Sequence, residues 1–183
     1  MGYSLGLFNL QARRQNQLLV DALYGKAVAQ ARLPIFYQAG AVPDSLDGRF
    51  DLLVLHMFLL LHRLGGESDR TRKLAQSLFD LMFADMDQSL REMGVSDMSV
   101  GKRVKEMARA FYGRIDAYER AMADGKQLQE ALTRNLYRGA EVSPAVLASM
   151  ASYMQAQVVK LAGLPLETIT AADIPCFEVW EGA

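Results

Sequence analysis

Hydrophobic side chains form one nearly unbroken run in this chain, from Phe50 to Leu61. Only Asp51 and His56 are polar within the run, so a helix here would be apolar on every side and would need neighbours all around it. A membrane-spanning helix needs about 20 apolar residues, whereas basic side chains close this run at both ends. The pattern therefore predicts a central buried helix over residues 50–62.

Apolar residues three or four positions apart recur along most of the remaining chain, which is the spacing of one face of an α-helix. The spacing predicts further helices over residues 9–32, 69–93, 98–122, 128–137 and 144–162. No segment shows a convincing alternation with a period of two, which would indicate a strand. We therefore expect an all-α fold, with one compact domain over residues 1–183 and about six helices arranged around the central one.

Glycine and proline interrupt the helical pattern at several points. Gly25 predicts a break or bend in the first helix, and residues 33–47 are expected to form a loop. The loop's apolar residues should lie over the core, because they gain little in water: Ile35, Phe36 and Tyr37. Residues 164–183 are expected to form an irregular tail that packs as an extended arm through Ile169, Phe177, Val179 and Trp180.

Composition limits the classes of protein to which the chain can belong. The formal net charge is −1 and 51% of the residues are hydrophobic, which argues against a general nucleic-acid binder and against a DNA partner. The single cysteine, Cys176, excludes an internal disulfide and a multi-cysteine metal site. Ten methionines are present, and their flexible thioethers suit either gap filling in a core or an adaptable binding surface.

The first residues are apolar, but their order does not match a secretory signal. Arg13 and Arg14 follow the apolar residues, whereas a secretory signal places its positive charges first. We therefore expect a cytoplasmic protein. Leu7 and Phe8 together with the arginine pair could make a peripheral contact with the inner face of the plasma membrane, and docking of this turn on the domain is the alternative.

Candidate catalytic and metal-binding groups are few. His56 and His62 are six residues apart, on different faces of one helix, and the carboxylates near Asp85 lack the Glu-x-x-His pattern of a di-iron bundle. His56, alone in an apolar run, fits a hydrogen-bonded core residue. We expect no catalytic residue, no metal and no cofactor, so the residues alone indicate a helical binding protein.

Four basic residues lie close together on the helix predicted over residues 98–122. Lys102, Lys105 and Arg109 share one face, with Arg103 beside them. Such a run of charge is typical of a solvated helix surface. A basic docking strip for a partner is the alternative.

A series of short motifs occurs in a fixed order between about residues 23 and 137. The main ones are Asp47-Gly48-Arg49-Phe50-Asp51, His62-Arg63-Leu64, the stretch from Phe79 to Asp87, Arg91-Glu92-Met93-Gly94-Val95, Phe111-Tyr112-Gly113-Arg114 and Arg134-Asn135. None is specific alone, but in this order and spacing they resemble the ubiquinol-cytochrome c chaperone family. The resemblance identifies most of the chain as one all-α domain of that family.

The resemblance implies a non-catalytic assembly factor for ubiquinol-cytochrome c reductase. Members of the family act on cytochrome b, the membrane subunit that must receive two haems. Mitochondrial members also work with a small partner protein and associate with the ribosome near the tunnel exit. The resemblance therefore implies cytochrome b as the client, with the small partner and the ribosome as further partners.

The motifs are densest where the helix carrying residues 83–87 would meet the helix carrying residues 102–118, and we expect the partner-binding face there. In this interpretation Asp85 and Asp87 form a charged rim, while Phe83 and Met86 supply apolar contact. The remaining candidates are Lys102, Arg109, Tyr112, Tyr118, Arg134 and Asn135. Helix packing is the alternative for the two tyrosines, and a helix cap or a salt bridge is the alternative for the last pair.

Two other binding functions fit the same fold. A helical carrier could hold haem or a lipid between its helices, with His56 as the axial ligand of a haem iron. A ribosome- or RNA-associated factor could use the basic strip, and its binding would then fall steeply with added salt.

Overall fold

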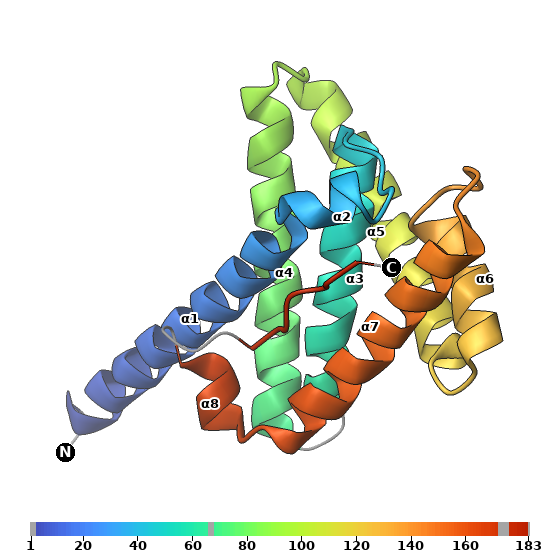
Figure 1. Cartoon of the computed structure of the whole chain (residues 1–183). Coiled ribbons are helices and arrows are strands. Elements are labelled where there is room, and N and C mark those ends of the chain that lie inside the picture. The colour runs from blue at the N-terminus through green and yellow to red at the C-terminus, as the bar shows by residue number, and fades with distance from the viewer. Residues whose placement is uncertain (1–2, 66–67, 172–175, 183) are drawn as a thin grey trace.

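The computed structural model describes residues 3–65, 68–171 and 176–182, with side chains from Arg14 onward. Every regular element in this part of the chain is a helix, as Figure 1 shows. The elements are α1 (Tyr3–Ala31), α2 (Pro34–Gln38), α3 (Leu46–Leu64), α4 (Asp69–Glu92), α5 (Asp97–Ala121), α6 (Gly125–Asn135), α7 (Pro144–Gly163) and α8 (Leu166–Thr170). The predicted all-α fold is confirmed.

The helix α3 lies at the centre of the fold, between α1, α4, α5 and α7 (Figure 1). Every residue from Phe50 to Leu60 is buried, which confirms the prediction of a central helix enclosed on all sides. The helix begins earlier than predicted, because the Ser45 hydroxyl accepts a hydrogen bond from the Gly48 backbone N–H at 3.1 Å and caps its first turn.

The long helices α4 and α5 form an antiparallel hairpin whose tip projects beyond the rest of the molecule (Figure 1). Their bounds agree closely with the predicted ranges. A reciprocal pair of hydrogen bonds between Ser68 and Thr71 caps the start of α4. Likewise Ser143 caps α7, with Pro144 in its first turn, as the sequence predicts.

The structure differs from the prediction in the number of helices and in the continuity of the first. The described residues form eight helices rather than about six, because α2 and α8 are five-residue helices that are too short to show a periodic pattern. The predicted bend at Gly25 is wrong, since α1 continues through it. Burial of the neighbouring Leu23 and Ala27 outweighs the cost of about 1 kcal/mol that a glycine brings to a helix.

A C-terminal arm, residues 176–182, crosses the front of α3 between α1 and α7 (Figure 1). The Gln157 amide pairs with both backbone groups of Glu178, at 3.1 and 3.4 Å, and Gln30 donates to the same carbonyl at 2.6 Å. Phe177 and Trp180 are buried beneath the arm, as predicted. The arm is therefore fixed by hydrogen bonds as well as by apolar burial.

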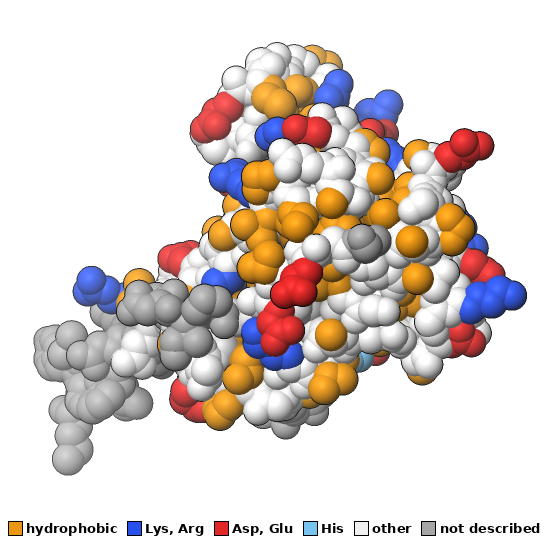
Figure 2. Space-filling model, in the orientation of Figure 1, with side chains coloured by type: hydrophobic (Ala, Val, Ile, Leu, Met, Phe, Trp, Pro, Cys, Tyr) orange, Lys and Arg blue, Asp and Glu red, His pale blue; other side chains and the backbone are white. Residues whose placement is uncertain are grey.

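Two residues of the predicted arm behave differently from the rest. Ile169 is buried but belongs to α8, while Val179 is 61% exposed because its side chain faces away from the core. Figure 2 shows hydrophobic side chains gathered on this face of the molecule, around α2 and the arm.

In the described ranges, no helix is both long enough and apolar enough to cross a bilayer. The peripheral membrane contact predicted through Leu7 and Phe8 depends on side chains that lie outside the described residues.

Candidate functional site

A groove, here called the main groove, opens where the ends of α1 and α4 approach the start of α3. It has a volume of about 380 Å³, which is within the usual range for ligand-binding clefts. The apolar side chains that line it are Val28, Ala31, Leu46, Phe50, Leu53, Met86, Leu90, Met93 and Met107. The main groove is therefore a largely apolar surface that remains open to solvent in this chain.

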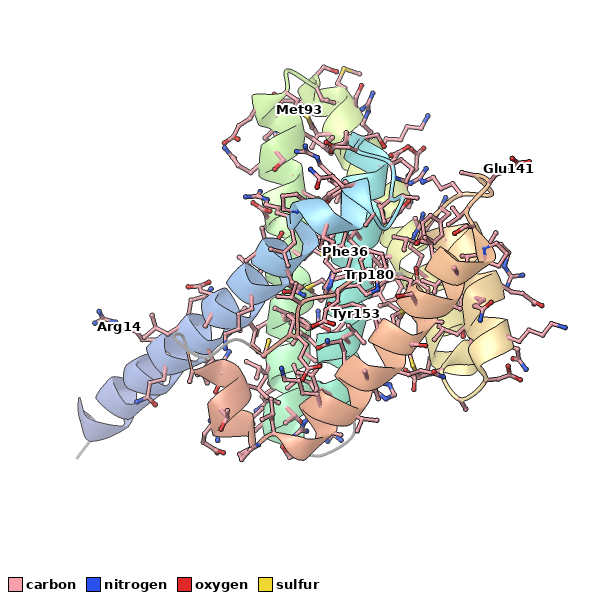
Figure 3. The ribbon with its side chains drawn as sticks, viewed as in Figure 1. Arg14, Phe36, Met93, Glu141, Tyr153 and Trp180 are labelled. Atoms are coloured by element: carbon pink, nitrogen blue, oxygen red, sulfur yellow. The ribbon has the colours of Figure 1, made fainter. Side chains whose placement is uncertain are left out.

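Methionine is prominent in this lining. Met86 belongs to α4, Met93 is the residue that caps the end of α4, and Met107 belongs to α5. Met93 is 53% exposed at the end of α4, where Figure 3 labels it, and Leu46 of α3 is 55% exposed. Flexible thioethers on an open apolar surface can repack around partners of different shape.

A second hollow of about 360 Å³, here called the side hollow, continues the main groove towards α5. The two share Leu46, Phe50, Leu90 and Met107 in their linings. Polar residues are more prominent in the side hollow, where Asp47, Arg103, Glu106 and Arg138 contribute to the lining. The two hollows together form one continuous concave surface.

The charged groups of the main groove come from different parts of the chain. Asp85 of α4 accepts a hydrogen bond of 2.6 Å from the hydroxyl of Tyr24. Burial, followed by this hydrogen bond, raises the pKa of Tyr24 well above its ordinary value. Arg32, Arg49 and Glu92 are exposed at the groove margin. The groove thus combines an apolar floor with charged sides.

The predicted site residues of α4 face two directions. Asp85 and Met86 line the main groove. The Phe83 ring instead packs edge-on against Phe111 of α5, with ring centroids 5.7 Å apart. Asp87 forms an ion pair with Arg91 on its own helix at 2.6 Å.

On α5, the predicted residues are also divided between different surroundings. Lys102 and Arg109 are exposed, and Tyr112 is 59% exposed with its ring 5.3 Å from that of Phe79. The inclusion of Tyr118 in a partner-binding face is wrong, because its side chain is fully buried and packs against Phe58. Its place on the apolar stripe of α5 was the sequence signal for that burial.

The last two predicted residues lie at the end of α6, outside the linings of the two hollows. Arg134 is exposed. Asn135 donates from its side chain to the Ala131 carbonyl at 2.9 Å, and its own backbone carbonyl accepts from Arg114 at 3.2 Å. The contact with Arg114 links α6 to α5, so Asn135 has a clear packing role.

Sequence reasoning missed a buried ion cluster at the base of the side hollow. The fully buried carboxylate of Asp51 accepts from Arg114 of α5 at 2.7 Å and from Arg138 of the α6–α7 loop at 2.5 Å. Arg138 also reaches the exposed Asp47 at 2.9 Å. Burial raises the pKa of Asp51, and the two guanidinium groups oppose that shift. The signal was available, because Asp51 is the lone carboxylate in the apolar run.

His56 forms part of a fully bonded chain of polar groups in the core. Its Nδ1 lies 2.9 Å from the Leu52 carbonyl, and its Nε2 lies 2.9 Å from the Tyr153 hydroxyl. A carbonyl can only accept, so Nδ1 carries the proton and Nε2 accepts from Tyr153. Tyr153 in turn accepts from Gln30 at 3.0 Å. The prediction of a hydrogen-bonded core histidine is confirmed.

Both ring nitrogens of His56 are therefore occupied, and aromatic rings enclose the imidazole. Phe36 and Phe177 pack edge-on against it at 5.4 and 5.2 Å between ring centroids. Phe36, Tyr153 and Trp180 lie close together in the middle of the molecule, as Figure 3 shows. This arrangement leaves no nitrogen of His56 to bind a haem iron, and in the described ranges no three His, Cys, Asp or Glu side chains form a metal-binding group.

The burial of His56 predicts that the protein loses stability in mild acid. Burial lowers the pKa of His56 from 6.5 to about 4. As the pH falls below 6.5, the unfolded chain binds a proton that the folded chain does not bind until about pH 4, so the free energy of unfolding falls. Between about pH 7.5 and pH 5 we expect a loss of about 2 kcal/mol from this group.

Urea denaturation of the wild type and of His56→Gln at both pH values measures this contribution. The variant has a lower free energy of unfolding at the start, because it interrupts the hydrogen bonds that link Leu52, His56, Tyr153 and Gln30. On acidification its free energy of unfolding should fall by about 2 kcal/mol less than that of the wild type. Equal losses in both proteins would show that His56 does not cause the acid sensitivity.

Comparison with known proteins places the chain among relatives of one kind. A model described as ubiquinol-cytochrome C chaperone matches residues 38–180. The chain is 26% identical over 124 residues to ubiquinol-cytochrome-c reductase complex assembly factor 1 of Xenopus laevis. It is 24% identical over 137 residues to the protein of the same name from Mus musculus. These matches cover 67% and 74% of this chain, but only 62% and 46% of the two relatives.

Among solved structures, the crystal structure of the Cbp3 homolog from Brucella abortus is similar along nearly the whole length. The TM-score is 0.83 at 38% sequence identity, covering 98% of this chain and 99% of that one. The family match reaches residue 180, beyond the expected limit near residue 137, and so includes α7 and most of the C-terminal arm. Both hollows have most of their lining within the matched residues.

Proposed function

The chain belongs to the ubiquinol-cytochrome c chaperone family, and from this membership we propose that it is a non-catalytic assembly chaperone for ubiquinol-cytochrome c reductase. Its client in this proposal is newly made cytochrome b. The observation that carries the proposal is the family match over residues 38–180. Agreement of the fold with a Cbp3 homolog at 38% identity supports it.

The main groove is the surface that suits this function best. An assembly chaperone must hold a client and later release it, so moderate affinity and an adaptable surface serve it better than a rigid lock. The groove offers Met86, Met93 and Met107 as part of its apolar lining. We therefore assign client contact to the main groove, with Asp85 and Met86 as the predicted site residues that contribute directly.

Recovery of the client from cells tests this assignment. Tagged protein is captured in mild detergent from its own cells, and cytochrome b is quantified by mass spectrometry. We expect the wild type to recover cytochrome b and Met93→Glu to recover about tenfold less, because a carboxylate on the groove margin opposes burial of an apolar client segment. Met93 is half exposed, so the change should spare the fold.

A matched control separates the groove from a general effect of added charge. Val159 of α7 is 74% exposed and lies outside the linings of both hollows, so Val159→Glu should recover as much cytochrome b as the wild type. Failure of the wild type to recover cytochrome b would overturn the function. Equal recovery by both variants would overturn the siting alone.

The same recovery experiment reports on further proposed partners. Lys102, Arg103, Lys105 and Arg109 form no ion pair with any described residue, so this strip is available to an anionic partner such as the ribosome. A small partner protein and a peripheral position at the inner face of the membrane complete the proposal. Ribosomal proteins, a small co-purifying protein and the membrane fraction of the cells are the respective readouts.

A further inference from the structure

Charged residues of opposite sign line the main groove on different elements of the fold. Arg32, which directly follows α1, and Arg49 of α3 form what we call the basic wall, and Asp85 and Glu92 of α4 form the acidic wall. Burial raises the pKa of Tyr37, which also lines the groove; the charges of Arg49 and Arg32 oppose this rise, whereas the charge of Asp44 adds to it. Both arginines therefore act on the same side chain of the groove lining, although one follows α1 and the other belongs to α3.

The walls do not neutralise each other in this chain. Asp85 accepts from Tyr24, and Glu92 accepts from Gln88 at 2.7 Å. Arg49 pairs with Asp44 at 2.7 Å, and Asp44 is not among the residues that line the groove. Among the described side chains no ion pair crosses the groove, so an occupant would meet both charges.

The charged walls restrict the kind of segment that the groove can accept. A uniformly apolar helix would cover the apolar floor. It would also remove water from the charged groups of both walls and offer them no polar partner, which is costly. A uniformly polar segment would leave the methionine and leucine floor without an apolar contact. A segment that suits both the floor and the walls needs an apolar stripe and, on separate sides of that stripe, charged residues.

We propose that the main groove binds an amphipathic helix whose apolar stripe has acidic residues along one flank and basic residues along the other. The acidic flank faces the basic wall and the basic flank faces the acidic wall. This inference rests on the proposed function, because the helix would belong to the client at the boundary between its membrane-spanning and water-exposed parts. The apolar stripe would insert side chains at helical spacing into the groove floor.

Three synthetic peptides of equal length test the inference by fluorescence anisotropy with the full chain. All share one stripe of leucine and methionine, and they differ only in their flanks, which are mixed, all glutamate or all lysine. We expect the mixed peptide to bind about tenfold tighter than either of the others, because like charges placed together across an interface are unfavourable.

Charge reversal in the groove should change this preference in a defined way. Arg32 and Glu92 are both exposed, so reversal of either should spare the fold, which circular dichroism verifies. Arg32→Glu should shift the preference towards the all-lysine peptide, and Glu92→Arg should shift it towards the all-glutamate peptide. Equal affinities for all peptides, an unchanged preference in both variants, or no binding would each overturn the inference.

The outcome separates the inference from the function on which it rests. If the wild type recovers cytochrome b but binds the three peptides equally well, the chaperone function is supported and the inference about the charged groove walls is contradicted. If the wild type prefers the mixed peptide but recovers no cytochrome b, the inferred binding preference of the groove is supported and cytochrome b as the client is contradicted.

Discussion

Replacing Asp51 by alanine is expected to lower the free energy of unfolding by about 3–5 kcal/mol, because it leaves buried positive charge without its partner. The Arg114 side chain is only 11% exposed and packs over the Phe50 ring, so water cannot replace the lost carboxylate easily. Arg138 would lose the same partner and with it the link from its loop to α3. Urea denaturation at neutral pH measures the loss.

Two neighbouring changes serve as controls for this prediction. Asp47 pairs with the same Arg138 but is 66% exposed, so Asp47→Ala should cost less than about 1 kcal/mol. The buried Tyr118 hydroxyl has no hydrogen-bond partner among the described residues, so Tyr118→Phe should be neutral or stabilising by about 1 kcal/mol. If Asp51→Ala cost no more than Asp47→Ala, the buried cluster would not stabilise the fold.

Replacing Trp180 by alanine should destabilise the protein by about 3–5 kcal/mol, the usual cost of removing a large buried aromatic side chain. The indole is 3% exposed and stacks on Phe36, with ring centroids 5.7 Å apart. Its Nε1 donates to the Ser149 hydroxyl at 2.9 Å. The loss, again measured by urea denaturation, would show that the C-terminal arm belongs to the core.

The adjacent residue provides the control for Trp180. Val179 shares the arm but is 61% exposed, so Val179→Ala should change the free energy of unfolding by about 0.5 kcal/mol at most. If Trp180→Ala lowers the free energy of unfolding by less than about 1 kcal/mol, the arm can detach from α3 without disturbing the fold. That result would contradict the assignment of the arm to the core.

The architecture could be predicted where one physical signal is dominant. The run from Phe50 to Leu60 is apolar on all sides, and only enclosure by other helices satisfies it. The bounds of α4, α5 and α7 followed from long periodic stripes and from capping residues such as Ser143. These features depend on neighbours in sequence, so a single sequence reveals them.

Features that depend on distant partners were not predictable in the same way. The partners of Asp51 lie 63 and 87 residues further along the chain, and no local pattern pairs them. The continuity of α1 through Gly25 depends on the burial of its neighbours against other helices. The short α2 and α8 carry too few residues for a period to be visible.

The candidate site was predicted in part. Asp85 and Met86, two of the predicted partner-binding residues, line the main groove, and their contact with a partner stays a prediction. The opposite side of the groove comes from Arg32 and Leu46, which precede the densest motifs and gave no signal of their own. The shape of a groove between several helices depends on how those helices cross, and the pattern along one helix does not contain that information.

The C-terminal arm has a consequence for the order in which the protein can fold during synthesis. The hydrogen bond from Gln30 to the Glu178 carbonyl can form only after Glu178, which is 148 positions later in the chain, has been synthesised. Until residues 176–180 have left the ribosome, the arm cannot cover its side of the core. Phe36 and the hydrogen-bonded residues around His56 are then exposed to water on that side. Contacts of such long sequence separation form slowly, so this protein should itself pass through a late, partly exposed state while it is being made.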